Sequence, residues 1–92
     1  MCDKVGRMTA EEATRFNEIV GALLRAEASY RKVSVLKLSK LSGIERNTLT
    51  RYLDGVRPIP VPVLYRVCEV IGVAPQTIIT GATQRMVEDP RG

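Results

Sequence analysis

Basic side chains are the residues of this sequence best suited to chemistry, and they lie close together. Residues 31–57 hold seven basic side chains against the two acids Glu45 and Asp54, for a net charge of +5. The basic residues are Arg31, Lys32, Lys37, Lys40, Arg46, Arg51 and Arg57. Residues 1–30 and 58–92 carry −1 and 0, so the overall charge of +4 comes from this window. Such a cluster is typical of a surface for a polyanion, although a solvated helix face gives the same pattern.

Residue types that catalyse reactions or bind metals are scarce. The chain has no histidine, which removes the commonest general base and the commonest metal ligand. Cys2 and Cys68 are too few for a structural zinc site, and their positions do not favour a disulfide. Glu11 and Glu12 are adjacent on a predicted helix, so their side chains point to different sides of it. We therefore expect no catalytic residue, no metal and no cofactor. We also expect that the protein is not an enzyme.

Length and hydropathy predict one globular domain. The chain has 92 residues, of which 45% are hydrophobic. No apolar run approaches the ~18–20 residues of a membrane span, and the first residues lack the apolar core of a signal peptide. These features predict a cytoplasmic protein without membrane contact.

Apolar residues recur every three or four positions, which predicts helices throughout. A capping box at Thr9-Ala10-Glu11-Glu12 begins a helix over about 9–29. Two shorter helices follow at about 35–41 and 45–53, a fourth runs from near Pro62 to Gly72, and a fifth begins at Pro75. Gly81 leaves the end of the fifth helix open. No segment alternates with a period of two, so we predict an all-α, compact bundle of four to five short helices.

Residues 35–52 read VLKLSKLSGIERNTLTRY and resemble the helix-turn-helix of the lambda repressor-like (Cro/repressor, XRE-type) family. The motif has a small residue where its two helices cross and a glycine in the tight turn between them, with apolar residues that fix their angle. The matching positions are Leu38, Ser39, Gly43, Ile44, Leu49 and Tyr52. Residues 54–58 resemble the family's helix–Gly–basic–Pro loop, and residues 64–73 resemble its fourth helix, so the resemblance covers about residues 15–80.

Some positions depart from the family pattern. Ser34-Val35 stand where the family often has Thr-Gln, and Glu45 stands where a hydroxyl residue usually caps the recognition helix. Ser42 occupies a usually apolar position, and Pro60 stands where a hydroxyl usually caps the fourth helix.

The resemblance implies that residues 9–80 form the helix-turn-helix DNA-binding domain, after an N-terminal arm at 1–8 and before a helix end and tail at 81–92. It also implies that the recognition helix, about 45–53, lies in the major groove. The expected base contacts are Arg46, Asn47, Thr50 and Arg51. The expected phosphate contacts are Arg31, Lys32, Ser34, Lys37, Thr48 and Arg57. Two alternatives remain open: Arg51 pairs with an acid such as Asp54, and Arg46 contacts only phosphate.

The resemblance thus implies a sequence-specific transcriptional regulator of double-stranded DNA, most simply a small phage or bacterial repressor of Cro type. Such a protein binds a palindromic operator as a homodimer, at least on DNA, and we expect no small-molecule ligand. The alternative function is an antitoxin-type or adaptor protein whose main role is to bind a partner protein.

The fifth helix carries an apolar stripe that we expect to lie beyond the core. A stripe of this kind leaves an exposed apolar patch on a monomer, and a two-fold partner could cover it. Its residues, predicted to form the dimer contact, are Ile78, Ile79, Ala82 and Met86. The alternative is that this helix folds back on the first helix and that the chain is monomeric until DNA brings two copies together.

Overall fold

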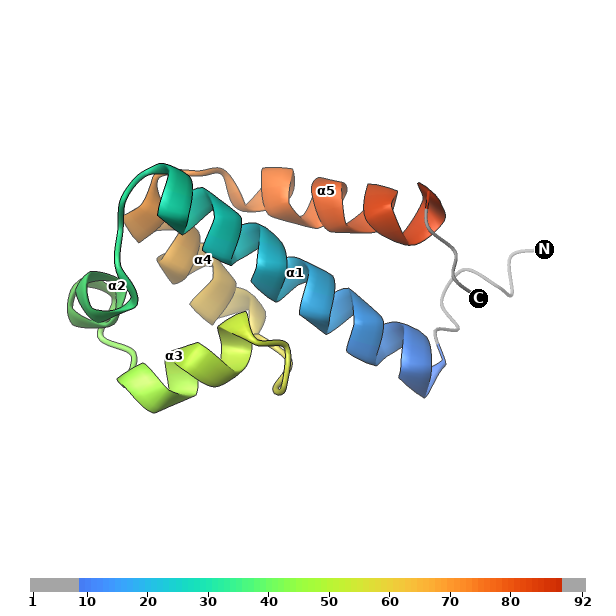
Figure 1. Cartoon of the computed structure of the whole chain (residues 1–92), viewed down its shortest axis with the longest axis horizontal. Helices are drawn as coiled ribbons and strands as arrows, with labels where there is room; N and C mark the ends of the chain where they lie inside the picture. Colours follow the sequence, from blue (N-terminus) through green and yellow to red (C-terminus); the bar gives the residue numbers. More distant parts are fainter. Residues whose placement is uncertain (1–8, 89–92) are drawn as a thin grey trace.

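The first four helices of the structure begin and end within two residues of their predicted bounds, and the fifth begins at Pro75 as predicted. The structure, a computed structural model, describes residues 9–88. In that range it has five helices and no strand: α1 (Ala10–Tyr30), α2 (Val35–Ser42), α3 (Arg46–Leu53), α4 (Val61–Ile71) and α5 (Pro75–Glu88) (Figure 1). The predicted all-α bundle is therefore confirmed. The predicted arm at 1–8 with Cys2, and residues 89–92 of the predicted tail, lie outside the described residues.

Local hydrogen bonds explain where the first two helices begin. The Glu12 amide donates to the Thr9 hydroxyl, and the Thr9 amide donates to a Glu12 carboxylate oxygen, both at 3.0 Å. This is the predicted capping box. The Ser34 hydroxyl accepts from the Lys37 amide at 3.1 Å and caps α2. The N-cap residues of α3 and α4 make no side-chain capping bond.

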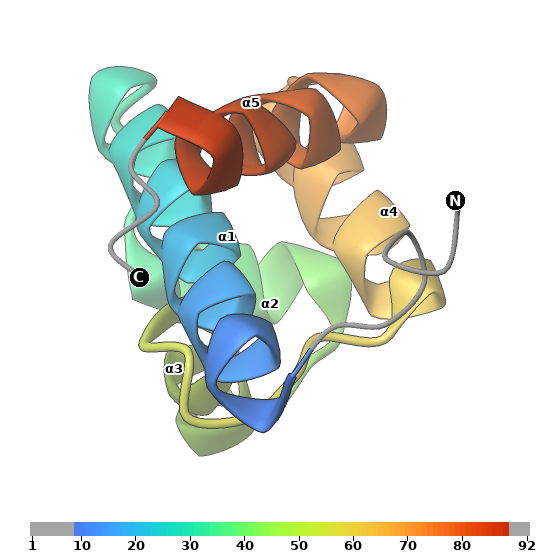
Figure 2. The same ribbon diagram turned by 90° about the vertical axis from the view of Figure 1, so that its right-hand side faces the viewer.

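The core lies where α1 crosses the other helices. α1 packs against α3, α4 and α5, while α2 packs against α3 and α4 (Figures 1 and 2). Cys68 is buried here, and burial raises the pKa of its thiol from 9.0 to about 11. The buried apolar residues are Val20, Leu24, Ala28, Leu38, Leu49, Leu53, Leu64, Val67, Cys68, Ile71, Ile78 and Ala82.

The expectation that the apolar stripe of α5 lies beyond the core is wrong. Ile78 is 2% exposed and Ala82 is fully buried, because α5 lies along α1 (Figure 2). Leu23 of α1, a partly buried apolar residue between Gly21 and Arg25, packs toward Gly81 of α5, so α5 covers a side of α1 that α3 does not. Within the stripe, only Ile79, at 40% exposed, and the half-buried Met86 remain accessible on a single chain. The observed packing of α5 against α1 is the one expected in the alternative, in which the fifth helix folds back on the first.

α4 and α5 meet at a sharp bend. Gly72 ends α4 with a φ of 95°, in the left-handed region that favours glycine. No single described helix is long and apolar enough to span a membrane, whereas α4 and α5 together have that length and composition with a bend of 111° between them. Beyond the bend, α5 continues through Gly81 without interruption to Glu88.

α1 and α3 approach each other closely at Gly21, a position the sequence analysis did not single out. A Cβ atom there would collide with the Leu53 carbonyl oxygen and lie 2.7 Å from the Leu53 carbonyl carbon. The backbone of α3 therefore rests directly on the backbone of α1. This contact fixes how deeply α3 sits against the rest of the bundle.

Candidate nucleic-acid interface

The turn between α2 and α3 is held by its glycine and by two serines. Gly43 has a φ of 78°, with nothing within 4 Å of the place where a Cβ would stand, so its backbone conformation is what calls for glycine. The Ser39 hydroxyl donates to the Ile44 carbonyl at 2.6 Å, and the Ser42 hydroxyl accepts from the Ile44 amide at 3.3 Å. Both polar groups of Ile44 are thus satisfied by side chains of α2.

Ser42 shows how the chain accommodates a polar residue at a usually apolar position. It is 4% exposed, and its hydroxyl bonds to the turn rather than facing apolar neighbours alone. Arg66 of α4 donates to the Ser42 carbonyl at 3.4 Å, so α4 also holds the end of α2. No sequence pattern indicates this role of Arg66, because its partner is a backbone group 24 residues away.

The outer face of α3 presents polar side chains to solvent. Leu49 and Leu53 of this helix are buried, while the four predicted base-contacting residues are exposed. Those four make no side-chain hydrogen bond or ion pair with any described residue. They are Arg46, Asn47, Thr50 and Arg51. This face is therefore free to bind an external partner.

The alternative in which Arg51 pairs with Asp54 is wrong. Asp54 instead bonds to Arg25 of α1, with 3.2 Å between a guanidinium nitrogen and a carboxylate oxygen. This ion pair ties the end of α3 to α1. Arg25 was not among the predicted functional residues, because it lies in a stretch whose net charge is negative.

Thr48 differs from the other predicted phosphate contacts. It is half-buried, and its hydroxyl donates to a Glu45 carboxylate oxygen at 3.0 Å. A hydroxyl has one proton, and phosphate oxygens only accept. In the free protein that proton is engaged, so a Thr48–phosphate bond requires the bond to Glu45 to break.

The remaining predicted phosphate contacts are exposed and lie outside α3, before and within α2 and in the loop after α3. Lys32 and Lys37 flank the start of α2, whereas Arg57 lies in the loop after α3. None of these three pairs with a described residue. Arg31 bonds to Glu27 at 3.2 Å, and Ser34 accepts from a backbone amide as a cap. Lys32 has a φ of 59°, a left-handed conformation that turns the chain from α1 to α2.

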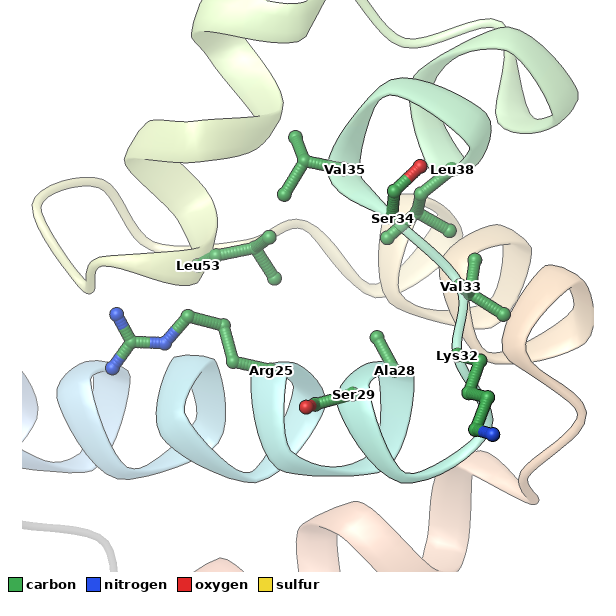
Figure 3. Close-up of a pocket in the computed structure, with 9 residues that line it drawn as sticks. All are labelled: Arg25, Ala28, Ser29, Lys32, Val33, Ser34, Val35, Leu38 and Leu53. Atoms are coloured by element: carbon green, nitrogen blue, oxygen red, sulfur yellow. The ribbon is translucent and has the colours of Figure 1, made fainter.

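A groove of about 520 Å³ lies at the start of α2 (Figure 3). Its floor is apolar, with the buried Ala28, Leu38 and Leu53, and its rim carries basic and hydroxyl side chains. Arg25 reaches along it from α1 toward the end of α3. The other lining residues are Ser29, Lys32, Val33, Ser34 and Val35.

Comparisons with known proteins agree with this geometry. A model of the Cro/C1-type HTH DNA-binding domain matches residues 24–81. The crystal structure of the clp gene regulator ClgR from Corynebacterium glutamicum is similar in fold, with a TM-score of 0.75. The two chains are 21% identical, and the similarity covers 83% of this chain and 81% of that chain. No curated protein sequence matches the chain.

The matched residues contain the end of α1, the whole of α2 to α4, and the start of α5. They include the turn at Gly43 and the polar face of α3. Since this match spans more than half of the sequence, the chain belongs to the family of Cro/C1-type helix-turn-helix DNA-binding domains.

Proposed function

We propose that the protein is a transcriptional regulator that binds double-stranded DNA with α3 in the major groove. The observation that carries the proposal is the outer face of α3, where four polar side chains are exposed and unpaired within the described part of the chain. Arg46 and Arg51 offer forked donors that suit guanine, and Asn47 can pair with adenine. Each bidentate contact is worth ~1–3 kcal/mol of discrimination.

Phosphate contacts on both sides of α3 would fix its register in the groove. Lys32 and Lys37 at the start of α2 would bind the backbone on one side, and Arg57 on the other. The hydroxyl and basic rim of the groove in Figure 3 adds to the first side. Because Asp54 is neutralised by Arg25, it does not oppose the approach of a phosphate.

The simplest biological form is a small phage or bacterial repressor of Cro type that binds a palindromic operator as a homodimer. One α3 covers only a few base pairs, so two copies would bind half-sites about 34–36 Å apart. With Ile78 and Ala82 buried, any contact through α5 uses its outer side, where Ile79 is 40% exposed and Val87 is 73% exposed.

A second candidate function is that of an adaptor that binds a partner protein. The observation in its favour is that three apolar side chains of α2 are exposed: Val35 by 37%, Leu36 by 49% and Leu41 by 62%. These side chains could lie against another protein. Co-purification from the native host tests this candidate.

Selection of random duplexes by the purified protein tests the main proposal. Recovery of a palindrome is the expected result, and affinity should fall steeply with salt because phosphate contacts release counterions. On the selected site, Arg46→Ala and Arg51→Ala should each cost ~1–3 kcal/mol and relax the preference at particular positions. Lys32→Ala and Arg57→Ala should weaken binding evenly across sequences.

Arg85→Ala provides a matched control. It removes the same charge from an exposed position in the last turn of α5 and should leave affinity nearly unchanged. Equal losses for all five variants on selected and random DNA would refute the assignment of α3 as the reading element. A flat dependence of affinity on salt would favour the adaptor.

A further inference from the structure

We infer that Glu45 is a specificity-determining residue, whose carboxylate accepts a hydrogen bond from the exocyclic amine of one base and disfavours DNA that lacks an amine at that point. This inference rests on the proposed function, because it supposes that α3 lies in the major groove. It goes further by assigning a role in recognition to an acid on a surface otherwise suited to a polyanion.

Glu45 lies at the N-terminal end of α3, close to the residues predicted to contact bases. It is the N-cap residue of α3, yet its side chain makes no capping bond to the helix backbone. Its carboxylate instead accepts from the Thr48 hydroxyl at 3.0 Å. The side chain is exposed and is held along the first turn of α3, next to Arg46 and Asn47. It therefore lies at the end of α3 that enters the groove first.

The negative charge of Glu45 is not neutralised by a neighbouring basic side chain in the described part of the chain. Residues 31–57 contain two acids, and the other one, Asp54, is neutralised by Arg25. No basic side chain among the described residues pairs with Glu45. Its charge therefore opposes the phosphates of any DNA that α3 approaches. This repulsion falls on all sequences alike unless a base supplies a donor that offsets it.

A carboxylate in the major groove can distinguish bases by their hydrogen-bond donors. An ionised carboxylate only accepts hydrogen bonds. In the major groove each base pair presents a single donor group, the cytosine N4 amine or the adenine N6 amine, beside acceptors. A carboxylate in a fixed position therefore meets an amine in one orientation of the pair and an acceptor in the other. Thr48 supplies the fixed position because its hydroxyl restrains the carboxylate.

A carboxylate at this place also interacts favourably with the N-terminus of a helix. That effect changes the stability of α3 and not its preference among bases. Discrimination between base pairs is thus the measurement that separates the two roles.

The experiment compares Glu45→Gln with Glu69→Gln. Both changes remove one negative charge from an exposed side chain, but Glu69 lies on α4 near the start of α5, beside Pro75. The assay measures dissociation constants for the selected operator, for each single base-pair change in it, and for random DNA. Melting temperatures confirm that each variant is folded.

Glutamine can donate as well as accept, so Glu45→Gln should lose about fivefold or more of the discrimination at one base pair. It should also bind random DNA more tightly than Glu69→Gln does. Thr48→Val keeps the charge and the side-chain shape, and it should lower discrimination at the same base pair. Whether cytosine or adenine is preferred at that position identifies the amine.

Equal behaviour of Glu45→Gln and Glu69→Gln at every base pair would overturn the inference while leaving the proposed function intact. A loss of discrimination spread evenly over the operator would overturn it too. If the wild-type protein selects no sequence at all, the proposed function fails, and this inference fails with it.

Discussion

Substitution by alanine should change the stability of the fold in opposite directions at two helical glycines, Gly21 and Gly81. Alanine in the middle of a helix is favoured over glycine by about 0.5–1 kcal/mol, so propensity alone predicts that Gly21→Ala in α1 and Gly81→Ala in α5 both stabilise the fold. Their surroundings differ. A Cβ at Gly81 has the end of the Leu23 side chain as its nearest neighbour, at 3.4 Å, whereas one at Gly21 meets the backbone of α3.

The distances set the size of the effect at Gly21. A Cβ there would be 2.7 Å from the Leu53 carbonyl carbon, while carbon atoms pack best at about 3.5–4.0 Å. α1 and α3 would have to separate by roughly 1 Å, which loosens the contacts of Leu24 and Leu49 in the core. Overpacking of this kind costs about 1–3 kcal/mol, and rigid backbone atoms place the cost at the upper end.

Thermal unfolding followed by circular dichroism measures both variants. One kcal/mol corresponds to about 4–8 °C for a domain of this size, so Gly21→Ala should lower Tm by about 10 °C or more. Gly81→Ala should raise it by about 2–8 °C. If Gly21→Ala melts at or above the wild-type temperature, the close approach of α1 and α3 is not as described, and the reasoning fails.

Three further predictions concern the turn, the buried thiol and the fifth helix. Ser42→Ala leaves the Ile44 amide without its acceptor and should cost about 1–3 kcal/mol in urea unfolding; no change would refute this role. The pKa of the Cys68 thiol is raised to about 11 in the folded state from 9.0, so the free energy of unfolding should fall as pH rises from 9 to 11. The free energy of unfolding of Cys68→Ala should fall less over this pH range. If wild type and Cys68→Ala lose the same stability between pH 9 and 11, the prediction is wrong. Ile78→Asp should unfold the monomer, whereas Ile79→Asp should keep the wild-type Tm and weaken self-association in sedimentation. A fully dimeric Ile79→Asp variant would exclude that side of α5 as the contact.

Local signals in the sequence were sufficient to predict the helices. The capping box at Thr9, the glycines that end α2 and α4, and the proline at the start of α5 all act within a few residues of their own positions. The motif also placed Leu49 among the apolar residues that fix the angle between α2 and α3, and Leu49 is buried. These features depend on backbone geometry that any helix shares.

Long-range contacts could not be predicted in the same way. The pairing of Arg25 with Asp54 joins residues 29 positions apart, and periodicity says nothing about which charged groups meet. The burial of Ile78 depends on α5 turning back along α1 after the bend at Gly72, a contact between helices far apart in the sequence. An apolar stripe alone does not distinguish a contact within one chain from a contact between two.

The function proposed for α3 also explains why distant residues should affect DNA reading. A helix of eight residues is marginal on its own, and this one lacks a side-chain cap. Its outer face must stay unpaired to bind DNA, so its stability has to come from its inner face and its two ends. The inner face rests on α1 at Gly21, one end is held through the turn at Ile44, and the other is tied by Arg25. A change at any of these three places alters the orientation of α3 without touching a residue that meets a base. Its effect on specific binding should therefore exceed its effect on binding to random DNA, which needs phosphate contacts alone.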